Sequence, residues 1–277
     1  MINICKAKLL PPMERETANY IVCKADPNTH GGCYVDTDTG MLHINLVEGR
    51  ENALRVVAGA NMAFHVVRFS YADLIRMREA VVRNDYAMII NAATINVWKN
   101  QVRILIARKH TSGFFIPQNL VYGEESYYID IEDYEVSALA GTNQDAYELC
   151  VSNVSTLNKN VVLQHILPNC LSVRACGGVP IPGDAVYGYG AETGGKWGHC
   201  VSNDAVIVIN DGAHRARISS QIETDFISNG TDNGGGLFLC DGIHNPLVGS
   251  VCASNMAHSW ASPLGELASV HQKTPNG

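Results

Sequence analysis

The chain has 277 residues and a formal net charge of −7, with 46% hydrophobic and 17% charged residues. This hydrophobic content is enough to bury a core, so the composition excludes an intrinsically disordered protein and allows one large domain or two small ones. The sparse, net negative charge gives no support to a broad electrostatic grip on nucleic acid or on an anionic membrane, and no apolar run is long enough to cross a bilayer.

The nine cysteines are an odd number, and the chain opens without a charged-then-apolar signal segment. We therefore expect mostly reduced, buried thiols in a cytoplasmic protein. No CxxC pair occurs, and the neighbours His199 and Cys200 have no second pair at a zinc-like spacing. The sequence therefore predicts no metal site and no cofactor.

Residues 1–86 read as an N-terminal extension with one helix over residues 70–84. The first 60 residues mix turn-forming residues with short apolar runs, which favours short strands or irregular structure. The helix is predicted because apolar residues recur at helical spacing after Ser70, whose side chain can cap a helix. The apolar positions are Leu74, Met77, Ala80 and Val81.

From Ala87 onward the pattern becomes that of β-structure. Val102, Ile104 and Ile106 alternate with other residues after a polar break, which predicts a hairpin whose second strand ends at His110. Further short strands are predicted at 113–121, 126–131, 146–151, 160–166, 185–189, 199–202, 205–209, 215–222, 236–240 and 246–253. Many short strands with little helix predict a mainly β fold, a sandwich or a pair of barrels, rather than βαβ units.

Three local patterns follow one another in the order base, carboxylate, nucleophile. His110 ends a strand in ILIARKHTSG, Asp145 begins an apolar strand in TNQDAYELCV, and Asn233 lies in TDNGGGLFLCDGIHNPLVGSVCASN. Between the last two, GDAVYGYGAETGGKWGHCVS reads as a strand, a Gly-rich turn and a strand. Nucleophilic hydrolysis requires such partners at positions that are distant in sequence.

Together these motifs, within residues 87–256, resemble the chymotrypsin-like proteases, and among them the 3C-like proteases of positive-strand RNA viruses. The resemblance implies a mainly β, two-barrel fold, with a first barrel over 87–175 and a second barrel and C-terminal tail over 176–277. It implies a polyprotein endopeptidase in the host cell cytoplasm that acts on a peptide or polyprotein segment. The residues implied are His110 as base, Asp145 as its orienting carboxylate, Asn233 at the nucleophile position, Thr231, Asp232 and Asn233 as oxyanion hole, and Val248, Gly249 and Ser250 as substrate-binding strand.

Two departures from the family bear on activity. The carboxamide of Asn233 cannot be deprotonated to attack a peptide carbonyl, and Thr231 replaces a glycine whose backbone helps to form the oxyanion hole. The strand from Val248 also lacks the histidine with which 3C-like enzymes read a glutamine side chain. We therefore expect an inactive relative or an inactivated variant of such an enzyme, with no glutamine preference.

Each of these residues also has a simpler interpretation. His110 is compatible with a surface histidine, Asp145 with a residue that begins a strand, and Asn233-Gly234 with a type I′ hairpin turn. Under this interpretation the chain is an all-β structural or interaction protein, such as a coat or scaffold subunit without catalysis, and self-association into a homo-oligomer is expected of a coat subunit. Two weaker alternatives are Cys176 as a competing nucleophile and the acidic run from Glu124 to Glu135 as a surface for a basic partner.

Overall fold

The computed structural model describes residues 9–54, 59–83, 89–113, 125–138, 179–190, 193–211, 214–240 and 246–264. The chain divides into two compact units. Unit 1 contains Met1–Leu9, Ser137–Asn203 and Ser220–Gly277, and unit 2 contains Leu10–Val136 and Asp204–Ser219. Of the predicted strands, those at 146–151 and 160–166 lie outside the described residues, as does nearly all of 113–121.

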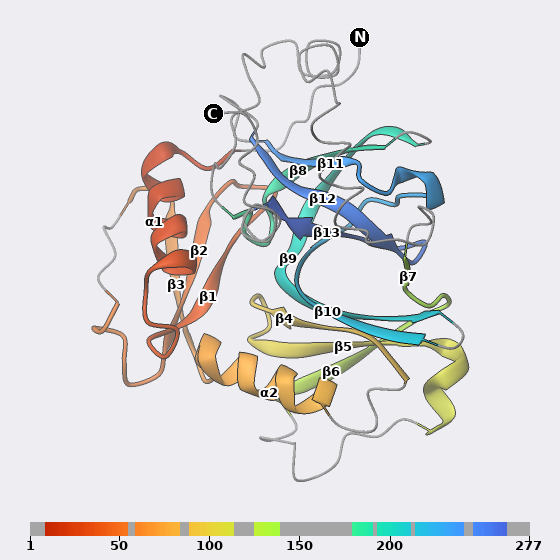
Figure 1. Cartoon of the computed structure of the whole chain (residues 1–277). Coiled ribbons are helices and arrows are strands. Elements are labelled where there is room, and N and C mark those ends of the chain that lie inside the picture. Colours follow the sequence, from red (N-terminus) through yellow and green to blue (C-terminus); the bar gives the residue numbers. More distant parts are fainter. Residues whose placement is uncertain are drawn as a thin grey trace. The chain divides into compact units, whose positions relative to one another are not determined.

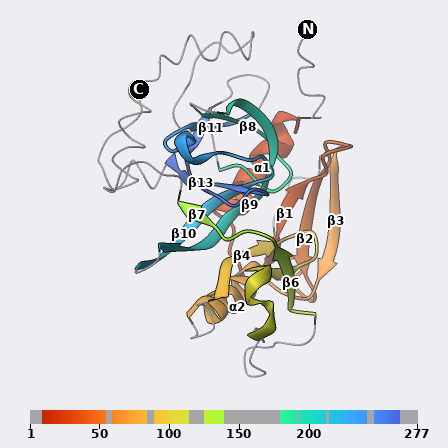
Figure 2. The ribbon, with the colours of Figure 1, turned by 90° about the vertical axis from the view of Figure 1, so that its right-hand side faces the viewer.

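Unit 2 carries both described α-helices and two groups of strands. Its elements are α1 (Pro12–Cys23), β1 (His30–Val35), β2 (Leu42–Val47), β3 (Met62–Val67), α2 (Tyr71–Arg83), β4 (Ile90–Asn96), β5 (Gln101–Ala107), the 3₁₀ helix η2 (Arg108–Gly113) and β6 (Tyr127–Glu132). One sheet has the order β1-β2-β3, with β1 antiparallel and β3 parallel to β2. In the other group β4 and β5 form an antiparallel hairpin, and β6 runs parallel to β5. Figures 1 and 2 show α1 beside the first sheet and α2 beside β4 and β5.

The helix α1 occupies a segment for which the sequence predicted short strands or irregular structure. Pro12 stands in its first turn, where the missing N–H of proline costs no helical hydrogen bond. The buried positions follow the helical period, but half of them are polar, so the apolar pattern that identifies a helix is absent. These buried residues are Glu14, Thr17, Ala18 and Ile21.

The helix α2 forms where it was predicted. Its first turn is capped reciprocally: the hydroxyl of Ser70 accepts a hydrogen bond from the N–H of Asp73 at 3.1 Å, and the Asp73 carboxylate accepts one from the N–H of Ser70 at 3.1 Å. Leu74, Met77 and Val81 are buried against β4 and β5 in the main apolar cluster of unit 2. Hydrophobic burial of one face thus fixes this helix on the strands that lead to His110.

His30, at the start of β1, gives unit 2 an acid-sensitive buried group. Only 3% of it is exposed, and burial lowers its pKa from 6.5 to about 4. Its Nδ1 accepts a hydrogen bond from the N–H of Gly32 at 3.1 Å, so protonation at Nδ1 would also break this bond. Because the unfolded chain binds the proton more readily, the contribution of His30 to stability is constant above pH 6.5, and we expect it to fall by roughly 3 kcal/mol as the pH drops from 6.5 to 4.

We expect His30→Asn to remove this part of the acid sensitivity, because an asparagine oxygen can still accept the Gly32 hydrogen bond but cannot be protonated in this range. The measurement is the free energy of urea unfolding at several pH values between 4 and 7, monitored by the far-ultraviolet circular dichroism of the helices. A variant whose stability falls with acid as steeply as that of the parent chain would contradict the assignment.

Unit 1 is built almost entirely of strands. Its elements are β7 (Ser137–Ala138), β8 (Ala185–Gly190), the 3₁₀ helix η4 (Gly230–Asp232), β11 (Gly236–Leu239), β12 (Leu247–Ser254) and β13 (Ser259–Pro263), and it shares β9 (Gly194–Asp211) and β10 (His214–Thr224) with unit 2. Adjacent strands pair in the order β10-β13-β12-β11-β8-β9, and β10 also pairs with β9, so the order closes on itself. Four of these strands, β11-β8-β9-β10, have the Greek-key order. The side chains inside include Val186, Cys200, Ile222, Leu237 and Val251.

The structure confirms the mainly β class and the predicted helix. The strand boundaries of β4, β5, β6, β8, β10, β11 and β12 agree with the sequence patterns to within a few residues, while the predicted strands at 199–202 and 205–209 are parts of the single strand β9. The division into barrels over 87–175 and 176–277 stays a prediction.

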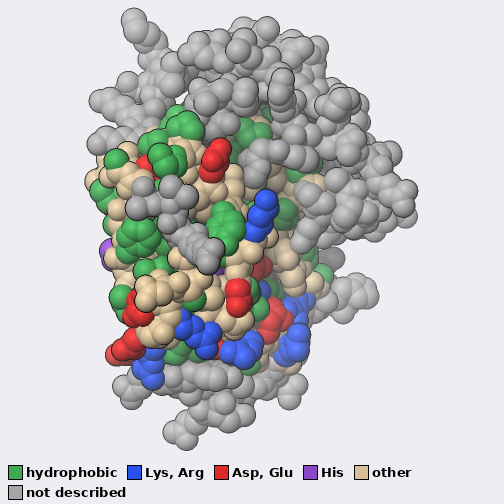
Figure 3. All heavy atoms as spheres, turned by 90° about the vertical axis from the view of Figure 1, so that its left-hand side faces the viewer, with side chains coloured by type: hydrophobic (Ala, Val, Ile, Leu, Met, Phe, Trp, Pro, Cys, Tyr) green, Lys and Arg blue, Asp and Glu red, His purple; other side chains and the backbone are tan. Residues whose placement is uncertain are grey.

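The surface and the cysteines give three further observations. On the face seen in Figure 3, hydrophobic side chains lie among polar and charged ones, and Lys and Arg side chains gather along its lower part. None of the helices in the described parts of the chain is long and apolar enough to span a bilayer. The described cysteines are thiols and not half-cystines: Cys23, Cys33, Cys200, Cys240 and Cys252.

Candidate functional site

The loop that leads into β11 in unit 1 carries the predicted nucleophile position. Residues 230–232 form η4, and Asn233 follows with φ −55° and ψ 131°. Gly234 then has φ +83°, and the N–H of Gly235 donates to the carbonyl oxygen of Asp232 at 2.9 Å. These angles and this hydrogen bond are those of a type II turn with Asn233 and Gly234 at its centre. The type I′ turn considered from the sequence is wrong, because it needs a positive φ at Asn233 as well.

The carboxylate of Asp232 holds this loop in place. Asp232 is buried, and its Oδ2 accepts hydrogen bonds from the N–H of Asn229 at 2.8 Å and from the hydroxyl of Thr193 at 2.7 Å. Its Oδ1 accepts the N–H of Thr193 at 3.1 Å. A Cβ built on Gly190 would stand 2.1 Å from Oδ1, so the carboxylate packs directly on the backbone of β8. Asp232 is therefore the anchor between the loop and the turn before β9.

Backbone hydrogen bonds connect the same loop to β12. The N–H of Gly234 donates to the carbonyl oxygen of Val251 at 2.9 Å, and the N–H of Val251 donates to the carbonyl oxygen of Gly235 at 2.8 Å. The N–H of Asp232, one of the amides predicted for an oxyanion hole, donates to the carbonyl oxygen of Asn229 at 3.0 Å. The amides of Asp232, Gly234 and Gly235 are thus engaged within the chain.

The predicted substrate-binding strand is central and not at an edge. In β12, Gly249 pairs with Leu237 of β11 on one side and with Pro263 of β13 on the other. Val248 and Ser250 are buried. A peptide would have to reach these residues by another route than strand addition, and their role stays a prediction.

His110 lies in unit 2, in η2, directly after β5. Its Nε2 is 2.9 Å from Oε1 of Glu135, and Nζ of Lys109 is 2.7 Å from Oε2 of the same carboxylate. Hydrogen bonds from Lys109 first, and then from His110, hold the pKa of Glu135 below its usual range. The carboxylate that contacts His110 is therefore Glu135. Asp145, predicted for this role, lies outside the described residues, as does Cys176.

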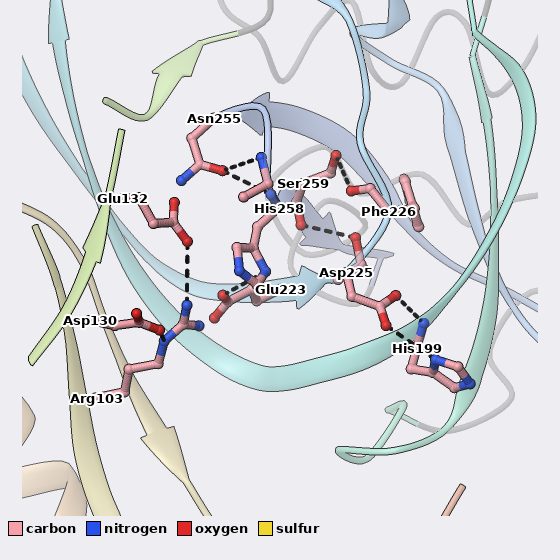
Figure 4. A network of polar contacts seen from close by, with 12 residues as sticks. Arg103, Asp130, Glu132, His199, Glu223, Asp225, Phe226, Asn255, His258 and Ser259 are labelled. Carbon is pink, nitrogen blue, oxygen red and sulfur yellow. Dashed lines mark hydrogen bonds and ion pairs between the residues drawn. The ribbon is translucent and has the colours of Figure 1, made fainter. Parts of the chain in front are cut away.

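The acidic run that ends at Glu135 makes its ion pairs within unit 2. Figure 4 shows Arg103 of β5 directed at Asp130 and Glu132 of β6, with Nε 2.9 Å from Asp130 and Nη2 3.4 Å from Glu132. Arg108 pairs with Asp133 at 2.6 Å. These carboxylates already have basic neighbours in the chain, which argues against the run as a docking surface for a basic partner.

Unit 1 contains two more pairs of a histidine and a carboxylate, both visible in Figure 4, which the sequence analysis missed. Asp225 accepts the backbone N–H of His199 at 2.6 Å, and its Oδ2 is 3.1 Å from Nδ1 of the ring. The Asp225 hydrogen bond raises the pKa of His199 above its usual value. The second pair is His258 and the buried Glu223, 3.2 Å apart. No spacing predicts either pair, because the partners are far apart in the sequence: Asp225 follows β10 and His258 precedes β13.

Among the residues that the structure describes, no group of three or more His, Cys, Asp or Glu side chains is arranged to hold a metal ion. Chemically, the loop offers a carboxamide at position 233 and a fixed type II turn, while His110 has the geometry of a base oriented by a carboxylate. For Thr231 the structure describes the backbone alone, which lies in η4.

The sequence matches no family model and no curated protein. Among solved structures it is similar to a glutamic acid specific serine protease described as using a histidine triad in substrate binding, with 19% identity, coverage of 38% of this chain and 53% of that one, and a TM-score of 0.28. Thermobifida fusca Protease A gives 16% identity, 39% and 55% coverage and a TM-score of 0.29. The MamO protease domain from Magnetospirillum magneticum has 19% sequence identity, with coverage of 37% of this chain and 51% of that one, and a TM-score of 0.27. The chain spans about half the length of these structures, and likeness of this extent does not establish its family.

Proposed function

We propose that the chain is a chymotrypsin-fold protein of the viral 3C-like type that has lost peptidase activity and retains the capacity to engage a peptide or polyprotein segment. The observation that carries the proposal is the loop of residues 230–235, which enters β11 of a closed six-strand order and presents Asn233 where a Ser or Cys would be needed. An amide side chain has no ionisable proton in the usable range and cannot serve as the nucleophile.

His110 and Glu135 support the same proposal. Their 2.9 Å contact places a carboxylate on a histidine that directly follows the second strand of a hairpin, as the resemblance implies for the base. Either Asp145 or Glu135 orients the base in this proposal, and replacing each carboxylate in turn distinguishes them. Location in the cytoplasm belongs to this proposal and agrees with the thiol state of the described cysteines.

The test is to rebuild the missing groups. The variant Asn233→Cys with Thr231→Gly should cleave members of a fluorogenic peptide library, whereas the parent chain should cleave none. Adding His110→Ala to the rebuilt chain should abolish cleavage, and Glu135→Gln compared with Asp145→Asn identifies the orienting carboxylate. Asn229→Cys in the parent chain is the matched control, since it places a thiol in the same loop away from position 233.

A rebuilt chain that is folded, as judged by circular dichroism and tryptophan fluorescence, and still cleaves nothing would count against the protease ancestry. Cleavage by the parent chain would contradict the loss of activity.

The internal use of the loop amides favours a second candidate function, an all-β structural or interaction protein. The N–H groups of Asp232, Gly234 and Gly235 donate to carbonyl oxygens of the chain, as expected of a turn with a purely structural role. Sedimentation or size-exclusion analysis separates the two, because a coat or scaffold subunit should assemble into defined oligomers and a peptide-binding domain need not.

A further inference from the structure

Four aromatic side chains form a contiguous ring cluster in unit 2, on the three-stranded sheet. The ring cluster consists of Trp98, Tyr34, His43 and His65. Tyr34 and His43 are register partners on β1 and β2, and His65 lies on β3, the edge strand of this sheet. Trp98 comes from the turn between β4 and β5. The fold therefore collects these rings from four separate segments, which no sequence motif announces.

The two histidines, here called the imidazole pair, lie edge to edge. Their ring planes differ by 5° and their centroids are 5.0 Å apart, while Nδ1 of His43 is 2.7 Å from Nε2 of His65. Parallel rings whose nitrogens are this close cannot be separated by a stacking distance of about 3.5 Å. One ring N–H therefore donates to the nitrogen of the other ring, and the two rings together present a flat surface wider than either one.

Tyr34 covers one face of the imidazole pair. Its ring centroid is 4.7 Å from that of His43 at an angle of 18°, and 6.4 Å from that of His65 at 13°. The ring centroid of Trp98 is 5.5 Å from that of Tyr34, and Trp98 is 42% exposed. His65 is exposed on the edge strand and His43 is partly exposed, so a planar ligand can reach the pair from solvent.

The surroundings of His43 disfavour its charged form. Burial first, and the neighbouring His65 second, lower the pKa of His43 below its usual value, and the opposing effect of Asp36 is smaller. The imidazole pair, held by one N–H···N bond, offers its aromatic faces to a ligand.

We propose that the imidazole pair is a stacking site for the planar base of a purine nucleotide, either free or within a single strand. Bases stack on Tyr, Trp and His side chains that project from a sheet, and a purine is wide enough to cover both imidazoles. The net charge of −7 favours recognition of the base over recognition of the phosphates.

The experiment titrates the full chain with adenosine, AMP and ribose 5-phosphate, while the histidine Cε1–H signals are followed by NMR. Adenosine and AMP should shift the signals of His43 and His65 upfield by ring stacking and leave those of His199 and His258 unchanged; ribose 5-phosphate should shift none. An adenine octanucleotide, compared with AMP at equal base concentration, distinguishes the two sources of the base. Tighter binding of the octanucleotide assigns a single strand, and equal binding assigns the free nucleotide.

The variant His65→Ala should weaken AMP binding by about 5- to 150-fold, the loss expected for one stacked base. His65→Phe keeps a flat ring and should bind within a few fold of the parent chain. The matched control is Phe64→Ala: Phe64 is an exposed aromatic neighbour, 46% accessible, whose side chain lies on the opposite face of β3. The proposal is overturned by the absence of shifts at His43 and His65, by an equal loss in Phe64→Ala, or by binding of ribose 5-phosphate as tight as that of AMP.

Discussion

Replacing Asp232 with alanine is expected to lower the free energy of unfolding by about 3 kcal/mol, because the change leaves the donors that the carboxylate serves without their acceptor. These donors are the N–H of Asn229 and both the N–H and the hydroxyl of Thr193. The carboxylate is also packed on Gly190, so its removal leaves a gap beside β8. Urea unfolding monitored by tryptophan fluorescence, to which the fully buried Trp260 of unit 1 contributes, measures the loss.

Two variants make this result specific to the anchor. Asp232→Asn keeps the shape and one acceptor oxygen, so it should lose about half as much stability as the alanine variant. Asp133→Ala removes a carboxylate that is 65% exposed and paired with Arg108, and it should cost less than about 1 kcal/mol. A loss in Asp232→Ala no larger than that in Asp133→Ala would show that the loop does not depend on this carboxylate.

Local patterns in the sequence predict the elements that have a regular apolar period. Alternation over Val102, Ile104 and Ile106 predicts β5 and its hairpin with β4, and both strands are found. Ser70 followed by Leu74 and Met77 predicts α2 because a cap and an apolar stripe occur together. These signals act within a few residues of each other, so one sequence suffices to detect them.

The candidate site depends on contacts that local patterns cannot predict. Glu135 reaches His110 because β6 runs parallel to β5 and the chain returns beside η2, a pairing that no short-range period encodes. The imidazole pair requires the parallel register of β2 and β3, and one residue of slip would turn His65 to the other face. The turn type at Asn233 is likewise set by Asp232 and by hydrogen bonds to β12, and not by the Asn-Gly dipeptide.

The position of His110 depends on how α2 packs on the strands that lead to it, and Leu74→Ala tests this packing. Leu74 is fully buried in the cluster that includes Met77, Ile104 and Ile106. Truncation removes its buried methyl groups and leaves a cavity between the helix and β4 and β5, which should cost between about 2 and 5 kcal/mol. Both described α-helices belong to unit 2, so circular dichroism at 222 nm during urea unfolding is the appropriate measurement.

Arg76→Ala is the matched control on the same helix, two residues away. The side chain of Arg76 is 68% exposed and pairs with Asp73 one turn earlier, an interaction that contributes a few tenths of a kcal/mol at the surface of a helix. Alanine also has the higher helix propensity, so the unfolding midpoint should hardly move. If Leu74→Ala were as mild as Arg76→Ala, α2 could not be the element that fixes β4 and β5, and the placement of His110 at the end of β5 would need another support. A large loss of unfolding free energy in Leu74→Ala but not in Arg76→Ala would show that the position of His110 depends on the core of unit 2.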